Sequence, residues 1–139
     1  MATFVLDTDI LSLHQRNHFR VGAAISSHAT DVLTISTITI EEQIGGWSAL
    51  ARSAKTPQQH EHASMFLAAL VASWREFALV PMTQQGLAEF ETLVKAKLNV
   101  KRNDLRIAAI ALELGATVVT RNRRDFCRVP GLLIEDWSV

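Results

Sequence analysis

Short, almost wholly apolar segments alternate along the chain with longer amphipathic ones, and this alternation constrains the fold more than any other feature. The short segments are rich in β-branched residues, which favours strands. Strands that alternate with helices typically form a parallel sheet that helices cover. The sequence therefore predicts an α/β fold with a parallel, layered sheet, whose strands are expected at residues 3–6, 31–36, 77–80, 117–120 and 132–134.

Residues that cap helices mark where several of the amphipathic segments begin. Asp9 stands where it would cap the first helix. Thr39 and Glu42 have the spacing of a capping box, in which each side chain bonds the other residue's backbone, and so do Thr56 and Gln59. Helices are therefore expected from residue 10 onward and at residues 39–52, 56–74, 87–98 and 105–114, the last ended by Gly115.

Length and composition limit the class of protein. Of the 139 residues, 48% are hydrophobic and 20% are charged, which is typical of a folded globular protein. The length predicts one domain over residues 1–139. The longest apolar run, residues 66–74, is too short to span a membrane, and no signal peptide is visible. Cys127 is the only cysteine, so we expect neither a disulfide nor a cysteine-based zinc site, and a cytoplasmic location without membrane association.

Charge is distributed unevenly along the chain, although acidic and basic residues are equal in number at 14 each. Residues 95–128 hold nine basic and only three acidic residues. Such a segment is either a solvated charged face or a basic patch that binds a polyanion such as a nucleic acid.

Acidic residues follow the predicted strands. Asp7 ends the first strand, Glu42 lies near the start of the helix after the second, and Asp104 opens the buried helix. Asn122 and Asp125 follow the fourth strand. Functional groups collect at the carboxyl ends of parallel strands, where clustered carboxylates repel one another unless a cation neutralises them. Mg²⁺ prefers such oxygen ligands, and bound Mg²⁺ would promote attack of water on a phosphodiester.

Each of these residues also has a structural explanation. Glu42 fits the capping box with Thr39, and Asp104 fits the first turn of a helix, where the helix dipole favours a carboxylate. Asp125 fits a loop cap. Asp7 is harder to explain in this way, because a carboxylate directly after a buried strand is costly without a partner.

Five blocks of the sequence stand in order at residues 5–11, 38–42, 103–112, 119–126 and 129–137, and together they cover nearly the whole chain. These blocks resemble the PIN-domain ribonucleases, and most of all the VapC toxins of prokaryotic toxin–antitoxin pairs. The resemblance implies a three-layer α/β/α sandwich with a central, mostly parallel sheet that binds Mg²⁺ or Mn²⁺ and cleaves RNA.

The resemblance also implies roles for individual residues. Asp7, Glu42 and Asp104 match the first three acidic positions of the family's site, and the Ile-Thr-x-x-Glu spacing selects Glu42 over the residue before it. The fourth acidic position falls on Asn122, which brings no charge and so disfavours a second metal ion. Asp125, one helical turn later, is the alternative source of that carboxylate.

Partners are implied as well. A toxin requires an antitoxin, here VapB-like, and an arginine of that antitoxin is expected to reach the acidic site. Homodimerisation through other helices is also implied. Arg121, Arg123, Arg124 and Arg128 are expected to hold RNA phosphates. The antitoxin is expected to bind an apolar groove formed by Ile40, Ile44, Trp47, Leu50, Ala51, Phe66, Leu67, Leu70, Val71 and Trp74.

Two other functions remain open from the sequence. The segment from Asp7 to Asp9 also resembles the Asp-x-Asp motif of haloacid-dehalogenase-type phosphatases, in which the first Asp is the nucleophile. No later acidic pair or suitably placed lysine completes that site. The other alternative is a catalytically silent PIN fold that only binds a partner or a nucleic acid.

Overall fold

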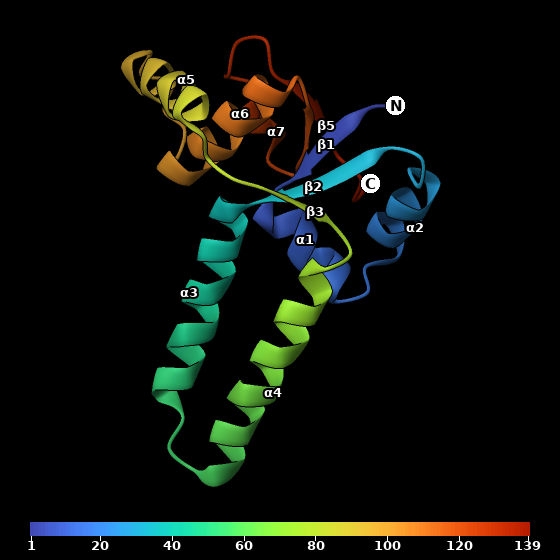
Figure 1. The fold of residues 1–139 in the computed structure, drawn as a ribbon, viewed down its shortest axis with the longest axis vertical. Coiled ribbons are helices and arrows are strands. Elements are labelled where there is room, and N and C mark those ends of the chain that lie inside the picture. The colour runs from blue at the N-terminus through green and yellow to red at the C-terminus, as the bar shows by residue number, and fades with distance from the viewer.

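The computed structural model describes all residues from 1 to 139 and has a five-stranded sheet in which every pair of neighbouring strands is parallel (Figure 1). The expected parallel α/β architecture is confirmed. The strands are β1 (Thr3–Leu6), β2 (Val32–Ser36), β3 (Ala78–Val80), β4 (Thr117–Val119) and β5 (Leu133–Glu135). The helices are α1 (Thr8–Gln15), α2 (Phe19–Ser27), α3 (Thr37–Ser53), α4 (Pro57–Trp74), α5 (Gln84–Lys95), α6 (Arg102–Leu114) and α7 (Arg123–Phe126).

Strand order explains where a functional site forms. The order is β3-β2-β1-β4-β5, so the chain builds the sheet outward from β1 in one direction and later in the other. The connections that leave β1 and β4 therefore diverge, and a crevice opens at the carboxyl ends of these two neighbouring strands. Asp7 is the first residue after β1, and it stands at this crevice.

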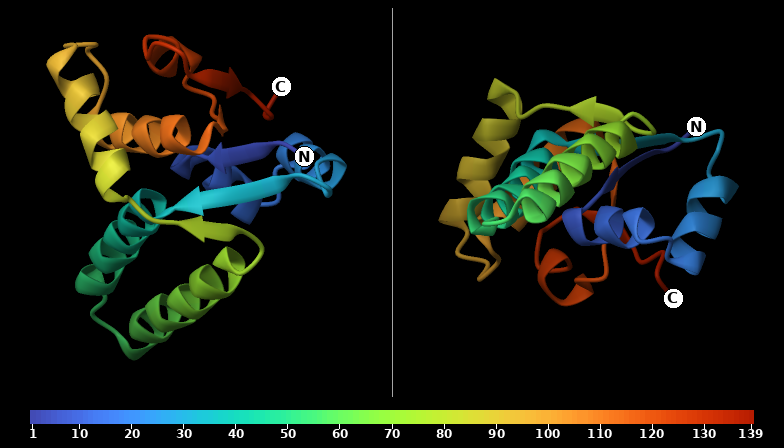
Figure 2. Two further views of the ribbon diagram at one scale, coloured as in Figure 1. Left: turned by 45° about the horizontal axis from the view of Figure 1, so that its top comes forward. Right: turned by 90° about the horizontal axis from the view of Figure 1, so that it is seen from below.

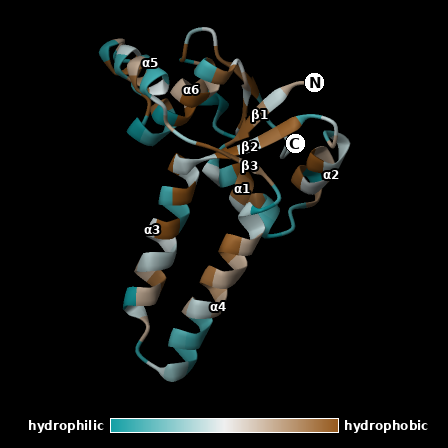
Figure 3. Ribbon diagram, in the orientation of Figure 1, coloured by the Kyte–Doolittle hydropathy of each residue, from teal (hydrophilic) through white to brown (hydrophobic).

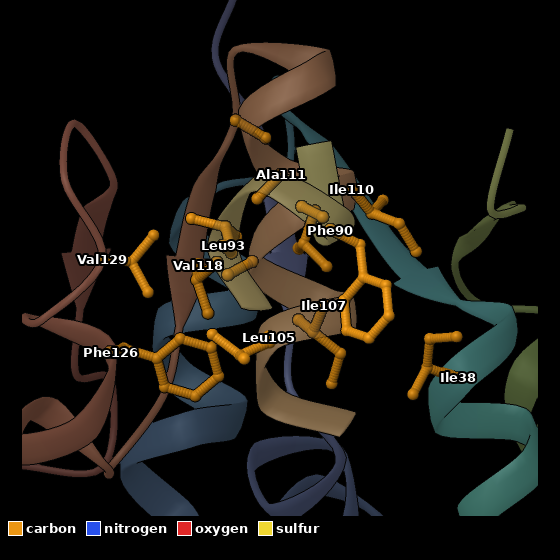
Figure 4. Close-up of a cluster of buried hydrophobic side chains, with 14 residues drawn as sticks. Ile38, Phe90, Leu93, Leu105, Ile107, Ile110, Ala111, Val118, Phe126 and Val129 are labelled. Atoms are coloured by element: carbon orange, nitrogen blue, oxygen red, sulfur yellow. The ribbon is translucent and has the colours of Figure 1, made fainter. Parts of the chain in front are cut away.

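Helices cover both faces of the sheet, as the apolar strands predict. Along β1, Val5 packs with α5 and α6, whereas the next residue, Leu6, packs with α1 and α2. Val118 and Val119 of β4 divide between the same two clusters. Figure 4 shows the first cluster, in which Phe126 packs beside Val118 and the side chains of α6. The sheet is thus the middle of three layers (Figure 2).

Helices α3 and α4 form a long hairpin that projects away from the sheet (Figure 1). The two helices pack against each other along the hairpin. Hydrophobic residues lie along α4 near the sheet, and the far end of the hairpin is hydrophilic (Figure 3). No helix is both long enough and apolar enough to cross a bilayer.

Two of the predicted helix caps were wrong. Asp7, not Asp9, caps α1, and its carboxylate accepts a hydrogen bond from the backbone N–H of Ile10 at 2.9 Å. Ser36, not Thr39, caps α3, and its hydroxyl accepts from the N–H of Thr39 at 3.3 Å. Both helices begin directly after a strand, so the residue at the strand end is the cap. Asp7 follows the last residue of β1, and Ser36 is the last residue of β2. The capping box at Thr56 and Gln59, and the left-handed Gly115 after α6, are confirmed.

Candidate functional site

Asp7 is the most enclosed of the predicted site residues, with 6% of its surface exposed. Its backbone N–H donates to the carbonyl of Val119 at 3.0 Å, which holds it at the join between β1 and β4. Burial raises the pKa of its carboxyl to about 6, and repulsion from Asp9 and Asp104 acts in the same direction. Hydrogen bonds from the Thr120 side chain and the Ile10 backbone oppose this rise.

Asp104 lies across the crevice from Asp7, in the first turn of α6. Partial burial raises the pKa of its carboxyl, and repulsion from Glu42 adds to the rise. The Asn122 amide donates a long hydrogen bond of 3.4 Å to its Oδ2. Burial, and to a smaller extent repulsion between carboxylates, therefore disfavours the ionised form of both Asp7 and Asp104.

Glu42 reaches the same crevice from α3, where its side chain is exposed. The Thr8 hydroxyl donates to its Oε1 at 2.7 Å and lies 3.0 Å from the hydroxyl of Thr39. Glu42 is thus not part of a helix cap, and this contact between α1 and α3 orients its carboxylate. The neighbouring Glu41 points elsewhere and pairs with Arg106 through two hydrogen bonds of 3.0 and 3.3 Å.

Asn122 and Asp125, the two candidates for the fourth position of the site, contact each other. The Asn122 amide donates to Asp125 Oδ2 at 3.0 Å as well as to Asp104. The other oxygen of Asp125 accepts from Arg128 at 3.3 Å. Asn122 lines the crevice, whereas Asp125 lines the adjacent pocket behind it. Asp125 therefore holds the amide that faces the crevice.

The crevice itself is a polar cleft of about 540 Å³ without a hydrophobic side chain in its lining. Four of the five predicted site residues line it, and Asp125 does not. Sequence reasoning did not assign Thr8, Asp9 or Lys101 to the site, although the position of Thr8 and Asp9 directly after β1 was a usable signal. The cleft, called here the acidic cleft, is lined by Asp7, Thr8, Asp9, Glu42, Lys101, Asp104, Arg121 and Asn122.

A hard divalent cation fits this donor set. No three His, Cys, Asp or Glu side chains converge closely enough to form a ligand cluster. Mg²⁺ does not require one, because it keeps several waters and binds proteins through one or two carboxylates together with substrate phosphate. Asp7 and Asp104 supply oxygen ligands only, and a bound cation would offset both the burial and the repulsion that raise the pKa of Asp7.

The basic segment contributes less to the acidic cleft than its sequence suggests. Arg121 lines the cleft and forms an ion pair with Asp9, with its Nε 2.6 Å from Oδ2. Arg128 instead pairs with Asp125 and donates to the carbonyl of Asn99 at 2.8 Å. The remaining two of the four predicted arginines, Arg123 and Arg124, lie on α7 and do not line the cleft.

A second, more apolar groove adjoins the acidic cleft. It has a volume of about 530 Å³ and lies between α1, α3 and α4. The indole of Trp47 donates to the carbonyl of Ala63 at 2.9 Å, which ties α3 to α4. Four of the ten side chains predicted to form the antitoxin groove line it, namely Trp47, Leu50, Phe66 and Leu70. We call this the hairpin groove, and Ser12, Gln15, Arg16, Gln43, Gly46, Ala69 and Ser73 complete its lining.

Comparison with known proteins identifies relatives over almost the whole chain. The model of the PIN domain family matches residues 4–132. Ribonuclease VapC1 of Haemophilus influenzae is 31% identical, and the match covers 97% of this chain and 98% of that protein. Ribonuclease VapC2 of Rickettsia felis is 29% identical with the same coverage. A crystal structure of DNA-bound VapBC from Salmonella typhimurium has a chain that is 27% identical, with a TM-score of 0.79 over 99% of both chains.

Proposed function

The chain belongs to the PIN domain family, as a VapC-type ribonuclease, and on that premise we propose that it is an Mg²⁺-dependent endoribonuclease that acts as the toxin of a toxin–antitoxin pair. Mn²⁺ has the same ligand preferences and is an alternative ion. The observation that carries the metal-dependent part is the meeting of Asp7, Glu42, Asp104 and Asn122 in one cleft.

Each of the four residues has a defined task in this proposal. Asp7 and Asp104 would hold the metal ion directly, with Glu42 as a further ligand directly or through water. When bound, the ion activates water and stabilises the charge that develops on the phosphodiester. The Asn122 amide donates to Asp104 and so orients that carboxylate toward the cleft.

The protein around these residues keeps them in place before the metal arrives. Asn122 donates its backbone N–H to the Thr120 hydroxyl at 2.9 Å, and that side chain in turn bonds Asp7. Thr8 orients Glu42 in the same way. The chain therefore holds its carboxylates in position by hydrogen bonds from residues that carry no charge, which leaves their negative charge available for a cation.

We further propose that a VapB-like antitoxin lies in the hairpin groove and blocks the acidic cleft. Helices α1 and α3 line both features, with Thr8 and Glu42 in the cleft and Ser12 and Gln43 in the groove. An antitoxin segment with an apolar face in the groove would therefore end at the cleft. An arginine at that end would bind the carboxylates with its fork of donors and displace the cation.

Two further expectations belong to the same proposal. We expect the protein to act in the cytoplasm, where its RNA substrate and its antitoxin would be made. We also expect a homodimer, and the exposed face of α5 that carries Leu87 and Val94 is a suitable surface for one. Light scattering of the purified protein would give the mass that tests this.

Incubation of the purified protein with RNA, with and without Mg²⁺, tests the central proposal. We expect cleavage with Mg²⁺ and none after the metal is chelated. Asp7→Asn keeps the shape of the side chain and removes a ligand charge, so cleavage should fall at least a hundredfold.

A matched pair of variants tests the assignment of Glu42. Glu42→Gln should reduce cleavage strongly, whereas Glu41→Gln removes the same charge one residue earlier and outside the cleft, and should leave cleavage near wild type. If Asp7→Asn cleaves as fast as wild type at limiting Mg²⁺, the proposed site is wrong. Complete inactivity of the wild type toward RNA would favour the silent fold.

A further inference from the structure

Two cations of the basic segment line the acidic cleft, and they enter it from different elements. Lys101 precedes α6, and Arg121 lies between β4 and α7. Lys101 lies next to the Asp104 side of the cleft, where its charge acts on that carboxylate. Arg121 pairs with Asp9, two residues after Asp7. Each of the two carboxylates proposed to hold the metal therefore has one cation near it in the lining of the same cleft.

The side chain of Arg121 is oriented in advance. Its Nε donates to Asp9 Oδ2 at 2.6 Å and its Nη2 donates to Oδ1 at 3.0 Å, so two of its five N–H donors are used. No other hydrogen bond is formed by this guanidinium, and its side chain is 49% exposed. The edge made by Nη1 and the second Nη2 hydrogen is free, and that edge has the geometry that binds a phosphate with two parallel hydrogen bonds.

Lys101 is also available to bind a phosphate, but its side chain is not held by a partner. It is exposed, and it takes part in none of the four ion pairs of the protein. Its ammonium group can follow a phosphate over a range of positions, because a lysine is a point charge on a flexible stem. The cleft thus offers one oriented cation and one mobile cation, both beside carboxylates.

We propose that Arg121, oriented by Asp9, and Lys101 form a two-point clamp that binds the RNA phosphates on either side of the one that is cut. Asp9 is then a positioning residue rather than a metal ligand, because both of its oxygens are engaged by Arg121. This inference rests on the proposed ribonuclease function and names the backbone of single-stranded RNA as what the cleft's cations bind.

Binding of a fluorescent single-stranded RNA of mixed sequence to the Asp7→Asn protein tests the clamp without interference from cleavage. Adding Arg121→Ala should raise Kd about tenfold and reduce the slope of log Kd against log salt by about 0.7, the value for one lost phosphate contact on a single strand. Lys101→Ala should give the same reduction in slope. Arg121→Lys keeps the charge but loses the fork, so the slope should recover more than the affinity.

Arg20→Ala is the matched control, because Arg20 is exposed on α2, forms no side-chain hydrogen bond and does not line the cleft. It should change Kd by less than twofold. Equal effects of Arg20→Ala and Arg121→Ala would overturn the clamp, as would failure of the protein to bind the RNA.

Single-turnover cleavage tests the positioning role of Asp9. Asp9→Asn releases Arg121, so RNA should bind as tightly as to wild type or more tightly, whereas the cleavage rate constant should fall about tenfold. A merely structural role would weaken RNA binding and cleavage together, and a variant equal to wild type in both would also overturn the positioning role.

RNA binding that depends on Arg121 but yields no fragments with Mg²⁺ would contradict the ribonuclease proposal and leave the clamp intact. RNA cleavage with Mg²⁺ that Arg121→Ala does not slow would contradict the clamp and leave the ribonuclease proposal standing.

Discussion

At the scale of single residues, Asp7 combines two demands that oppose each other. Its burial favours the metal-free, protonated carboxyl, whereas metal binding needs the carboxylate. In the absence of metal the folded protein therefore binds a proton at Asp7 up to about pH 6, while the unfolded chain releases it near 3.8. Stability is consequently lost as the pH rises through this window, because the native state binds more protons there than the unfolded state does.

Asp7→Asn should therefore make the metal-free protein more stable while it abolishes cleavage. Asn caps a helix about as well as Asp, so the helix start is retained. At pH 7 we expect the free energy of unfolding to increase by about 2 kcal/mol, since a pKa shift of this size is equivalent to about 3 kcal/mol at most. Urea unfolding at several pH values measures this, and the difference should shrink toward pH 4. Mg²⁺ should stabilise wild type but not the variant, and an Asn variant less stable than wild type at pH 7 would contradict this account.

Residue-scale contacts also show what the sequence could not predict. The three acidic residues proposed as metal ligands were predicted from their places after strands and near helix starts, and the cleft brings them together. The pair between Asp9 and Arg121 joins residues 112 positions apart, so no local pattern reveals it. The same holds for Asp125, which was an alternative source of the fourth carboxylate. It bonds Asn122 and Arg128 and does not line the cleft.

At the scale of elements, the strands and five of the seven helices were predicted from the sequence, whereas α2 and α7 were not. Helix α2 buries only two residues, Val21 and Ile25, on one short face, and α7 has a single turn, so each offers few residues to a periodic pattern. Helix α3 began earlier than predicted because Ser36 is at once the end of β2 and the cap of the helix.

Helix α3 also contains two adjacent glycines that its local packing does not require. A methyl group added to Gly45 or Gly46 would meet no atom within 4 Å. Each Gly→Ala change should therefore increase the free energy of unfolding by up to about 1 kcal/mol through helix propensity, as measured by urea unfolding. Only Gly46 lines the hairpin groove, so Gly46→Ala should also weaken binding of the antitoxin, and Gly45→Ala is its control. Equal antitoxin affinity of the two variants would show that the partner does not approach the helix at Gly46.

At the scale of the whole molecule, the projecting hairpin is the feature that sequence patterns described least well. The apolar faces of α3 and α4 were predicted from the sequence to form a groove for the antitoxin. At the sheet end of the hairpin, Ile40 and Trp74 pack against the core cluster of β1 and β2. Farther from the sheet the two helices pack on each other and leave the hairpin groove open beside α1 (Figure 1). Periodicity identifies an apolar face, but it does not tell which neighbour covers that face.

The separation of groove and cleft predicts that toxicity and neutralisation can be removed independently. Expression of the chain alone should arrest growth, and co-expression with the reading frame next to its gene should restore it. Asp7→Asn should be harmless and still co-purify with the antitoxin, because the groove is intact.

Phe66→Asp places a charge in the groove at a side chain that is already 44% exposed, so the protein should fold, cleave RNA and remain toxic despite the antitoxin. Phe19→Asp, at an exposed position outside the groove, should be neutralised as wild type is. Equal toxicity of wild type with and without the neighbouring frame, and no co-purifying small protein, would contradict the toxin proposal and leave the ribonuclease proposal standing.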